Sequence, residues 1–386
     1  MPDAHAGGVR SIRVGVNVRP ALWPNSGVAR IILNLLRALP PIAPAWTFML
    51  YSAQRPKSGH PLWSIIDTNP NCELRLVPSS STLLFEMVRL PHTLLHDRID
   101  VFLATIPETR LRGGVRTLLT IYDVIPELFP RTSPVRLRLL RATGLVRRNV
   151  ARCGEVLCFS KHTAEDIKRV YGIAADKVTV AHPGVDPSIY RIDRRTARAT
   201  VGSRFDIRGR YFLTLHVAEH GSFFQGYSTY VDRESAPLPL VVVCGRQAAA
   251  RMRADVARLQ LSHMVHWLHE VTDAELSALY SSCAAFVYPS LYEGFGLPVL
   301  EAIACGALCI AYGVSSLPEI VGSAGLVLDP GDPDRLIDAL RAVTADPDLQ
   351  LKYEDAINVQ ARSFQWEIAA HAVRSALERV SRRSPD

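Results

Sequence analysis

Short apolar runs alternate with longer amphipathic stretches along most of this chain. Apolar runs typical of buried parallel strands occur at 12–18, 48–51, 74–77, 101–103, 118–121, 156–159, 178–180, 211–216, 240–243, 284–288 and 307–311. Helical periodicity follows several of them, as in 27–39, where apolar residues recur on one face. Strands that alternate with helices predict an α/β fold with parallel sheets, and the pattern restarts in the second half of the chain.

The most informative stretch runs from Pro289 to Gly306, between two predicted strands. Pro298 suits the first helical position and Gly306 suits the left-handed residue past a helix end, so we expect a crossover helix that starts just after Gly294–Leu297. Backbone N–H groups at a helix start are unpaired and lie at the positive end of the helix dipole. A phosphate or sugar oxygen could bind there, and glycine lets a ligand approach the backbone closely.

Two glutamates flank this loop. Glu293 precedes it, and Glu301 lies about one turn inside the helix with its side chain tilted back toward the same mouth. Carboxylates repel phosphate but accept hydrogen bonds from hydroxyls, which favours ribose as one partner and a transferred sugar as the other. Taken singly, Glu301 could merely complement the helix dipole and Glu293 could be a solvated loop residue. Together they predict a nucleotide-sugar site.

The spacing of glutamate, seven residues and glutamate around this loop resembles the donor-site signature of retaining glycosyltransferases with the GT-B fold, of the group 1 type found in bacterial mannosyltransferases. The resemblance runs with little interruption from Thr272 to Pro330. The rival is a dinucleotide-binding loop, because Gly294 and Gly296 open a helix. In that motif, however, a third glycine would replace Val299, and an acidic residue would end the next strand.

The resemblance implies two Rossmann-like domains that face a central cleft. Residues 1–186 would bind the acceptor, 187–363 would bind the nucleotide sugar, and a terminal helix within 364–386 would pack back on the first domain. The implied reaction moves a sugar from a nucleoside diphosphate sugar, with GDP-mannose as the first choice, to a hydroxyl of a glycan or lipid-linked acceptor. It proceeds with retention, requires no metal, and serves cell-surface polysaccharide or lipopolysaccharide synthesis.

Two elements of the first half also resemble the family. Gly27-Val28-Ala29-Arg30 matches a Gly-Val-x-Arg element near the donor phosphates and the acceptor, which assigns Gly27 to the donor and Arg30 to the acceptor; an ordinary turn with a solvated arginine is the alternative. Tyr122-Asp123-Val124-Ile125-Pro126 resembles a His-Asp-x-x-Pro segment that faces the transferred sugar, with Tyr122 in place of histidine. Asp123 could instead cap the next turn, and its role as a general base stays open.

One departure from the family concerns the charge on the leaving diphosphate. Where the family carries an Arg and Lys pair after the strand 211–216, this chain has Val217–Gly226, which contains neither residue. The remaining candidates are the helix start at Phe295–Leu297, Arg246 after the strand 240–243, and His216 or His220 in protonated form. Arg246 could equally be a surface residue. A catalytically silent sugar-nucleotide-binding protein or partner subunit is therefore the second hypothesis.

The stretch 135–152 predicts a basic amphipathic helix, because arginines and aliphatic residues alternate in it without an acidic residue. Such a helix can lie on an anionic membrane surface. A core helix with a solvated arginine face is the alternative, and Gly144 interrupts the pattern.

Composition limits the kinds of partner and the cellular location that the protein could have. The 386 residues suffice for two domains, and the net charge of +7 suits an anionic partner such as a nucleotide diphosphate or lipid headgroups, without nucleic-acid motifs. The chain has neither an apolar run that could cross a bilayer nor a signal peptide, so we expect a cytoplasmic protein that could be peripheral on the inner face of the membrane.

The seven cysteines lack zinc-type spacing and predict buried thiols. Asp329–Asp334 predicts a turn and a helix start in preference to a metal site.

Overall fold

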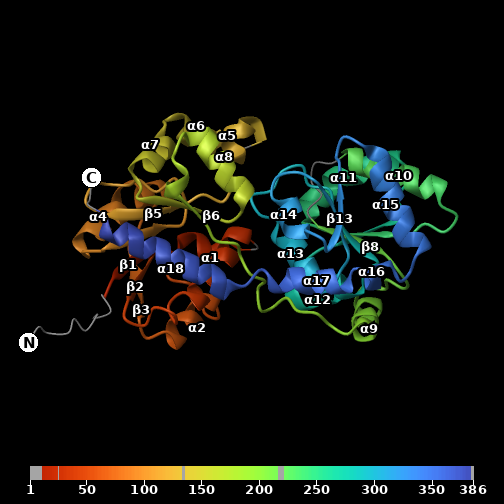
Figure 1. Cartoon of the computed structure of the whole chain (residues 1–386), viewed down its shortest axis with the longest axis horizontal. Helices are drawn as coiled ribbons and strands as arrows, with labels where there is room; N and C mark the ends of the chain where they lie inside the picture. Colours follow the sequence, from red (N-terminus) through yellow and green to blue (C-terminus); the bar gives the residue numbers. More distant parts are fainter. Residues whose placement is uncertain (1–10, 25, 133–134, 216–220, 384–386) are drawn as a thin grey trace, which may run out of the picture. The chain divides into compact units, whose positions relative to one another are not determined.

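The computed structural model describes residues 11–24, 26–132, 135–215 and 221–383 (Figure 1). The chain forms two compact units. Unit 1 contains the chain up to Pro183 together with the segment from Gln365 onward, and unit 2 is Gly184–Phe364. The division thus falls close to the boundaries expected from the sequence, while the acceptor and donor roles of the units stay predictions.

Unit 1 is built on a parallel sheet of seven strands in the order β3-β2-β1-β4-β5-β6-β7. The strands are β1 (Arg13–Asn17), β2 (Thr47–Ser52), β3 (Cys72–Leu76), β4 (Val101–Ala104), β5 (Arg116–Thr120), β6 (Glu155–Cys158) and β7 (Val178–Val180). The α-helices are α1 (Gly27–Ala38), α2 (Pro61–Thr68), α3 (Thr82–Leu84), α4 (Leu90–His96), α5 (Ile125–Leu128), α6 (Val135–Ala142), α7 (Leu145–Arg152), α8 (Lys161–Tyr171) and α18 (Trp366–Arg382). The terminal helix α18 packs beside α1 and against β4 to β7 (Figure 1).

Unit 2 repeats this plan with six parallel strands in the order β10-β9-β8-β11-β12-β13. They are β8 (Phe212–Leu215), β9 (Leu240–Val243), β10 (Val265–Leu268), β11 (Ala285–Tyr288), β12 (Cys309–Tyr312) and β13 (Gly325–Leu328). The helices are α9 (Arg194–Phe205), α10 (Gly221–Arg233), α11 (Arg246–Arg258), α12 (Asp273–Ser282), α13 (Leu297–Ala304), α14 (Leu317–Val321), α15 (Pro333–Ala345), α16 (Leu349–Lys352) and α17 (Glu354–Arg362). Two parallel sheets flanked by helices confirm the predicted α/β class.

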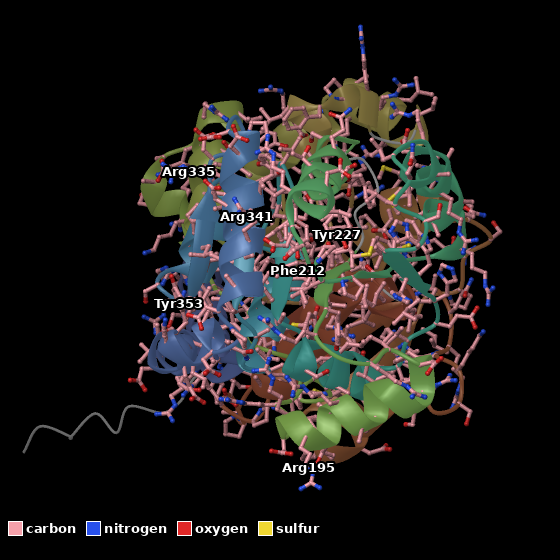
Figure 2. All side chains as sticks on the ribbon, turned by 90° about the vertical axis from the view of Figure 1, so that its right-hand side faces the viewer. Arg195, Phe212, Tyr227, Arg335, Arg341 and Tyr353 are labelled. Atoms are coloured by element: carbon pink, nitrogen blue, oxygen red, sulfur yellow. The ribbon has the colours of Figure 1, made fainter. Side chains whose placement is uncertain are left out.

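An aromatic core supports one face of the unit 2 sheet. Figure 2 shows Phe212 and Tyr227 in the interior, whereas Arg195 and Arg335 lie at the surface. Phe212 of β8 meets the ring of Tyr230 edge-on at 5.8 Å, and Tyr227 lies 5.7 Å from Tyr230. The two phenols are satisfied by hydrogen bonds to Leu238 O and Thr344 Oγ1, as buried tyrosines require. This packing joins α10 and α15 to β8, the strand next to β11 in the sheet.

Both sheets reverse their winding direction at one place. In unit 1 the chain winds outward from β1 toward β3 and from β4 toward β7, and in unit 2 it does the same from β8 and from β11. A crevice opens at such a switch point, outside the carboxyl ends of the strands, and ligands of doubly wound sheets bind there. In unit 2 this crevice lies at the loops that follow β8 and β11, and in unit 1 at the loops that follow β1 and β4.

One predicted element is wrong. The stretch 135–152 is two short helices, α6 and α7, because Gly144 adopts a left-handed conformation with φ 71° and interrupts the helical hydrogen bonds. Other signals are confirmed. Asp332 caps α15, and all seven cysteines are buried thiols. Thr272 and Glu275 form a capping box at the start of α12.

Candidate functional site

The start of α13 presents unpaired backbone donors at the switch point of unit 2. Gly296 precedes the helix with φ 106°, and the N–H groups of Gly296 and Leu297 have no hydrogen-bond partner among the residues that the structure describes. Pro298 occupies the second helical position, not the expected first, and lacks an N–H group. An oxygen atom near this helix start would meet two N–H donors and the positive end of the helix dipole.

Gly296 is required for a reason that the sequence analysis did not foresee. A Cβ atom at this position would lie 2.9 Å from Leu317 Cδ2 and 3.3 Å from Ile320 Cδ1, both on α14. The left-handed backbone disfavours any other residue as well. The left-handed backbone therefore favours glycine here, and the side chains of α14 add to that preference, independently of how closely a ligand approaches.

Two serines after β12 hold the loop from Glu293 to Gly296 in place. The N–H of Glu293 donates to Ser315 Oγ at 2.9 Å, and Ser316 Oγ lies within donating distance of Glu293 O (3.1 Å) and Phe295 O (2.5 Å). The sequence placed Ser315 and Ser316 in the family resemblance but gave no sign of this contact. The carboxyl ends of the neighbouring strands β11 and β12 bring the two loops together.

Glu293 and Glu301 both lie close to the phenol of Tyr288. Tyr288 Oη and Ser290 Oγ donate to Glu293 Oε1 at 2.8 Å and 2.9 Å. Burial raises the pKa of Tyr288, and the charges of Glu293 and Glu301 raise it further. The structure thus brings the two carboxylates together, and Glu293 is a half-buried, bonded group and not a solvated loop residue.

Glu301 is only 6% exposed and lies 3.4 Å from the hydroxyl of the buried Tyr280. A buried carboxylate is costly unless hydrogen bonds compensate it, so a mere interaction with the helix dipole explains Glu301 poorly. Phe295, in contrast, buries its ring against Phe364 at 5.8 Å. Of the predicted donor-binding residues, Phe295 can therefore contribute its backbone only.

The positive groups proposed for the diphosphate are less well placed. Arg246 is the first residue of α11, its side chain is 73% exposed, and its Nε lies 3.3 Å from Glu270 Oε1. Strand β8 separates β9, which precedes Arg246, from β11, which precedes Glu293. The sheet therefore does not place Arg246 on a strand adjacent to the glutamate loop. His216 and His220 lie outside the described residues.

In unit 1 the predicted site residues also follow the carboxyl ends of strands. Gly27 is the exposed first residue of α1, and the half-buried Arg30 bonds through its N–H to Ser26 O at 3.0 Å. Tyr122 follows β5 and stacks on Phe159 at 5.3 Å, and burial raises the pKa of its hydroxyl. Asp123 Oδ1 accepts the N–H of Ile125 at 2.9 Å, so Asp123 does cap the turn that begins α5.

An ion-pair network that the sequence did not indicate lies near Asp123. Arg141 of α6 lies 2.7 Å from Glu108 Oε1 and also pairs with Glu127, whose Oε1 accepts the hydroxyl of Tyr171 at 2.7 Å. The side chains of Arg141, Glu108 and Glu127 are only 13–16% exposed. Arg141 is thus not part of a basic surface, as its place in 135–152 had suggested, because it compensates two carboxylates from distant segments.

This network acts on Asp123 by charge. Burial raises the pKa of Asp123, the Ile125 N–H and Arg141 oppose that rise, and the charge of Glu127 adds to it. A half-buried carboxyl with a raised pKa is a candidate for proton transfer to or from a bound substrate. Capping the turn and acting on substrate are compatible, because only Oδ1 carries the bond to Ile125.

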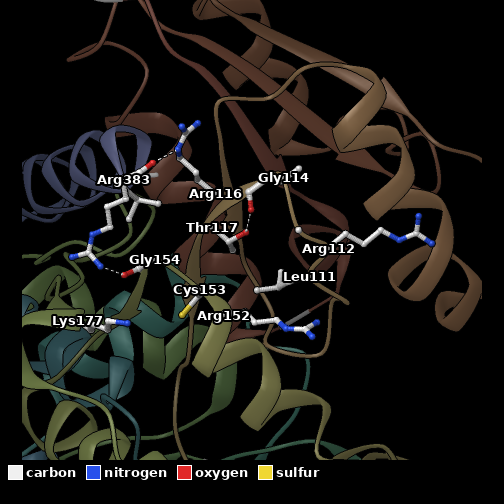
Figure 3. Close-up of a pocket in the computed structure, with 13 residues that line it drawn as sticks. Leu111, Arg112, Gly114, Arg116, Thr117, Arg152, Cys153, Gly154, Lys177 and Arg383 are labelled. Carbon is white, nitrogen blue, oxygen red and sulfur yellow. Dashed lines mark hydrogen bonds between the residues drawn. The ribbon is translucent and has the colours of Figure 1, made fainter. Parts of the chain in front are cut away.

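A cavity of about 420 Å³ in unit 1 lies at the other side of the sheet from Tyr122 and Asp123, beside the amino ends of β5 and β6 (Figure 3). Its lining is basic, but Figure 3 shows the charged ends of Arg116, Arg152 and Arg383 pointing in different directions. Arg383 donates to Gly154 O, and Arg116 donates to Arg383 O. These bonds join the end of α18 to the sheet, which indicates a structural role.

Within the described ranges, no cluster of three or more His, Cys, Asp or Glu side chains could hold a metal ion. Over the same ranges, no helix has both the length and the apolar character needed to span a bilayer. The expected absence of a metal requirement stays a prediction.

Two family models match the chain in succession. Residues 25–189 match the model of Glycosyltransferase Family 4, and residues 230–361 match that of Glycosyl transferases group 1. The chain is 27% identical over 242 residues to the O-antigen chain mannosyltransferase RfbU of Salmonella typhimurium, which covers 62% of this chain and 64% of that protein. It is 43% identical over 104 residues to O-antigen chain mannosyltransferase B of Escherichia coli, 27% of each chain. The matched parts span less than two thirds of both relatives.

Solved structures show the same fold. The crystal structure of Anabaena Alr3699/HepE in complex with UDP and glucose has a TM-score of 0.71 at 14% identity, and the match covers 95% of this chain and 99% of that one.

Proposed function

We propose that this chain, which belongs to the glycosyltransferases with the GT-B fold, transfers mannose from GDP-mannose to a hydroxyl of a glycan or lipid-linked acceptor, with retention of configuration. The observation that carries the proposal is the arrangement at the start of α13. Two backbone N–H groups without a described partner lie there beside Glu293 and Glu301, whose charges both act on Tyr288. The names of the O-antigen mannosyltransferase relatives support mannose as the sugar and surface polysaccharide as the product.

In this proposal the unit 2 loop binds the donor. The N–H groups of Gly296 and Leu297 donate to the diphosphate and stabilise the negative charge that grows on it as the sugar leaves. Glu301 accepts hydrogen bonds from ribose hydroxyls, and Glu293 accepts them from the transferred sugar. This proposal requires no metal ion, because the helix start and the side chain of Arg246 compensate the negative charge of the diphosphate.

Unit 1 supplies the acceptor groups in the same proposal. Tyr122, Asp123 and Arg30 contact hydroxyls of the acceptor or of the transferred sugar, while Gly27 contributes its backbone to the donor phosphates. The raised pKa of Asp123 suits a group that accepts a proton from the acceptor hydroxyl at near-neutral pH. Catalysis otherwise rests on positioning of the two substrates.

The test is a transfer assay with GDP-mannose, GDP-fucose, UDP-glucose and UDP-galactose against a synthetic mannoside acceptor, followed by proton NMR of the anomeric signals. The proposal expects turnover with GDP-mannose and an α-linked product. A β-linked product would overturn retention, and transfer from a UDP-sugar alone would overturn the choice of donor.

A catalytically silent binding protein is the second candidate, and the sequence of the α10 start favours it. Gly221 and Ser222, the first two residues of this helix, stand in the region where the family carries its Arg and Lys pair, and Arg246 is mostly exposed. The double variant Gly221→Arg with Ser222→Lys separates the two candidates. An enzyme with weakened charge compensation gains turnover, whereas a silent protein binds the donor and cleaves it in neither form.

The proposed location is the cytoplasmic face of the membrane. Helix α6 exposes Val135 (60%) and Leu139 (67%) next to the exposed Arg138, a combination that suits anionic headgroups. Wild type should bind vesicles that contain phosphatidylglycerol in a salt-sensitive manner, and replacement of the arginines of α6 and α7 at 136, 138, 147 and 148 should weaken that binding. Absence of salt-sensitive binding by the wild type would end the membrane proposal.

A further inference from the structure

A cavity of about 460 Å³ lies over the carboxyl ends of β1, β2 and β3 in unit 1. Its walls include Arg19 and Trp23, which follow β1, Gln54, which follows β2, and the serines 79–81, which follow β3. The cavity lies on the sheet edge that carries Tyr122 and Asp123 but over different strands. Three strand spacings separate β2 from β5, a distance of roughly 14 Å.

Arg19 is fixed in this cavity by a buried carboxylate. Its Nε lies 2.7 Å from Glu86 Oε1, and Glu86 is only 3% exposed. Glu86 also accepts from Asn17 Nδ2 and Thr109 Oγ1, so its charge is fully compensated. Within the described ranges, the Nη groups of Arg19 make no hydrogen bond, and they remain as two donors whose charge Glu86 neutralises.

Trp23 is held next to these donors. The guanidinium of Arg19 lies over its ring, 5.3 Å from the centroid, while Trp23 remains 38% exposed. Glu86 itself lies in a π-helical turn, Phe85–Arg89, and such turns are frequent at functional sites. An irregular turn and the buried carboxylate of Glu86 thus hold Arg19 in position, and Arg19 in turn contacts the partly exposed indole of Trp23.

The opposite wall is made of hydroxyl and amide groups. Ser81 Oγ accepts the N–H of Leu84, and Ser79 Oγ donates to Ser81 O at 2.9 Å, which fixes the loop. The side chains of Ser80 and Gln54 are exposed and make no hydrogen bond to any described residue. The cavity therefore offers an aromatic surface, paired N–H donors and neutral polar groups without net charge.

We propose that this cavity binds an uncharged sugar unit of the acceptor glycan, other than the unit that receives the transferred sugar. A pyranose has an apolar C–H face that suits an indole and vicinal hydroxyls that suit the planar fork of a guanidinium. Neutralisation of Arg19 by Glu86 removes the advantage that an anionic ligand would otherwise have. The inference rests on the proposed function, because it extends the acceptor from one sugar to a chain.

The experiment compares α-linked mannotetraose with methyl α-mannoside as acceptors for the full chain and its variants. Trp23→Ala should raise the KM for mannotetraose about tenfold, leave kcat unchanged and leave the KM for methyl α-mannoside unchanged. Gln54→Ala should act in the same direction by a smaller factor. Trp63→Ala is the matched control, because Trp63 also carries a stacked arginine, Arg55 at 5.0 Å, but outside this cavity, and it should alter neither constant.

A binding titration without donor separates failure of this inference from failure of the proposed function. Mannotetraose should change the tryptophan fluorescence of the wild type and of Trp63→Ala but not that of Trp23→Ala. If the wild type binds mannotetraose through Trp23 yet transfers no sugar, the cavity assignment stands and the proposed function falls. Equal KM values and equal binding for wild type and Trp23→Ala would overturn the inference, as would tighter binding of mannose 6-phosphate than of mannose.

Discussion

The site loop of unit 2 is held by hydroxyl groups, whereas the site segment of unit 1 is held by ion pairs. Ser315, Ser316 and Tyr288 form hydrogen bonds to the loop around Glu293. In each of these bonds the partner of the loop is a hydroxyl group. Arg141 bonds the segment around Asp123 by pairing with carboxylates. The two halves of the reaction should therefore respond differently to pH, because the raised pKa of Asp123 makes the acceptor side sensitive, whereas the serine hydroxyls that hold the donor loop do not titrate.

The largest effect is expected from Arg141→Ala. Removal of one partner from a buried ion pair costs about 3 to 5 kcal/mol, and slight exposure of these side chains places the expected loss near the lower limit. The free energy of unfolding, measured with urea, should fall accordingly. Arg138→Ala is the control, because Arg138 is exposed on the same helix, and its effect should stay within about 0.5 kcal/mol.

Arg141→Ala should also change the pH profile. Arg141 lowers the pKa of Asp123, so its removal raises that pKa and moves the acid limb of kcat/KM to higher pH. The same loss of activity at every pH would show that Arg141 acts on the fold alone. The claim that its charge tunes the pKa of Asp123 during the reaction would then be wrong.

Glu301→Ala should weaken binding of GDP-mannose about ten- to a hundredfold, because a hydrogen bond to a charged group contributes about 1.5 to 3 kcal/mol. Calorimetric titration measures the change. Tyr280→Phe is the matched control, since it removes the bond between Tyr280 and Glu301 from the other side and leaves the carboxylate in place. Equal affinity of wild type and a folded Glu301→Ala would remove Glu301 from the donor site.

Ser316→Ala tests the hydroxyl contacts of unit 2. It removes the donor to Glu293 O and Phe295 O, which should cost about 1 to 2 kcal/mol in unfolding free energy and weaken donor binding severalfold. The loss of affinity should be the same from pH 6 to pH 8. A loss that grows with pH would mean that a charged group, not the serine, holds the loop.

Arg246→Ala should lower turnover by up to about tenfold and leave donor affinity nearly unchanged, provided that Arg246 leaves Glu270 and meets the diphosphate in the transition state. Its exposure keeps the expected effect small. Single-turnover rates test this, and Arg251→Ala, which replaces another exposed arginine of α11, is the control. Unchanged rates would refute the compensation by Arg246 without affecting the fold assignment.

The smallest effect concerns stability at Asp123. Its pKa is raised in the folded state, so ionisation destabilises the fold above the raised pKa, and this cost disappears as the pH falls toward the ordinary aspartate value near 4. Asp123→Asn should therefore unfold at the same or a higher temperature than wild type at pH 7, and the difference should vanish at low pH. A clearly lower Tm at pH 7 would contradict the burial argument.

The strands and the donor loop could be predicted because their signals are local. Apolar runs indicated most of the parallel strands, but β10 and β13 were not predicted, because these edge strands are only partly buried. The donor site is contained in the contiguous stretch from Glu293 to Glu301, where Gly296 ends the loop and starts the helix. The break between α6 and α7 was suggested by Gly144 but could not be decided, because a single glycine in a helical pattern is often tolerated.

The unit 1 contacts could not be predicted, because they join residues that are far apart in the sequence. Arg141 lies 33 positions from Glu108, and Arg19 lies 67 positions from Glu86. No periodicity or spacing records such pairs, so the pattern of 135–152 favoured a surface position for Arg141, and nothing in the sequence singled out Arg19. Only the order of the strands, which places the ends of β1, β4 and β5 side by side, brings them together.

The central claim, that the start of α13 binds the diphosphate of a nucleotide sugar, is tested most directly by NMR of the full chain labelled with ¹⁵N-leucine. The amide signal of Leu297 can be assigned by its loss in Leu297→Met. Addition of GDP-mannose should shift this signal, because the Leu297 N–H, which has no partner among the described residues, gains an acceptor. An unchanged Leu297 signal at a concentration of GDP-mannose that calorimetry shows to be saturating would contradict the claim.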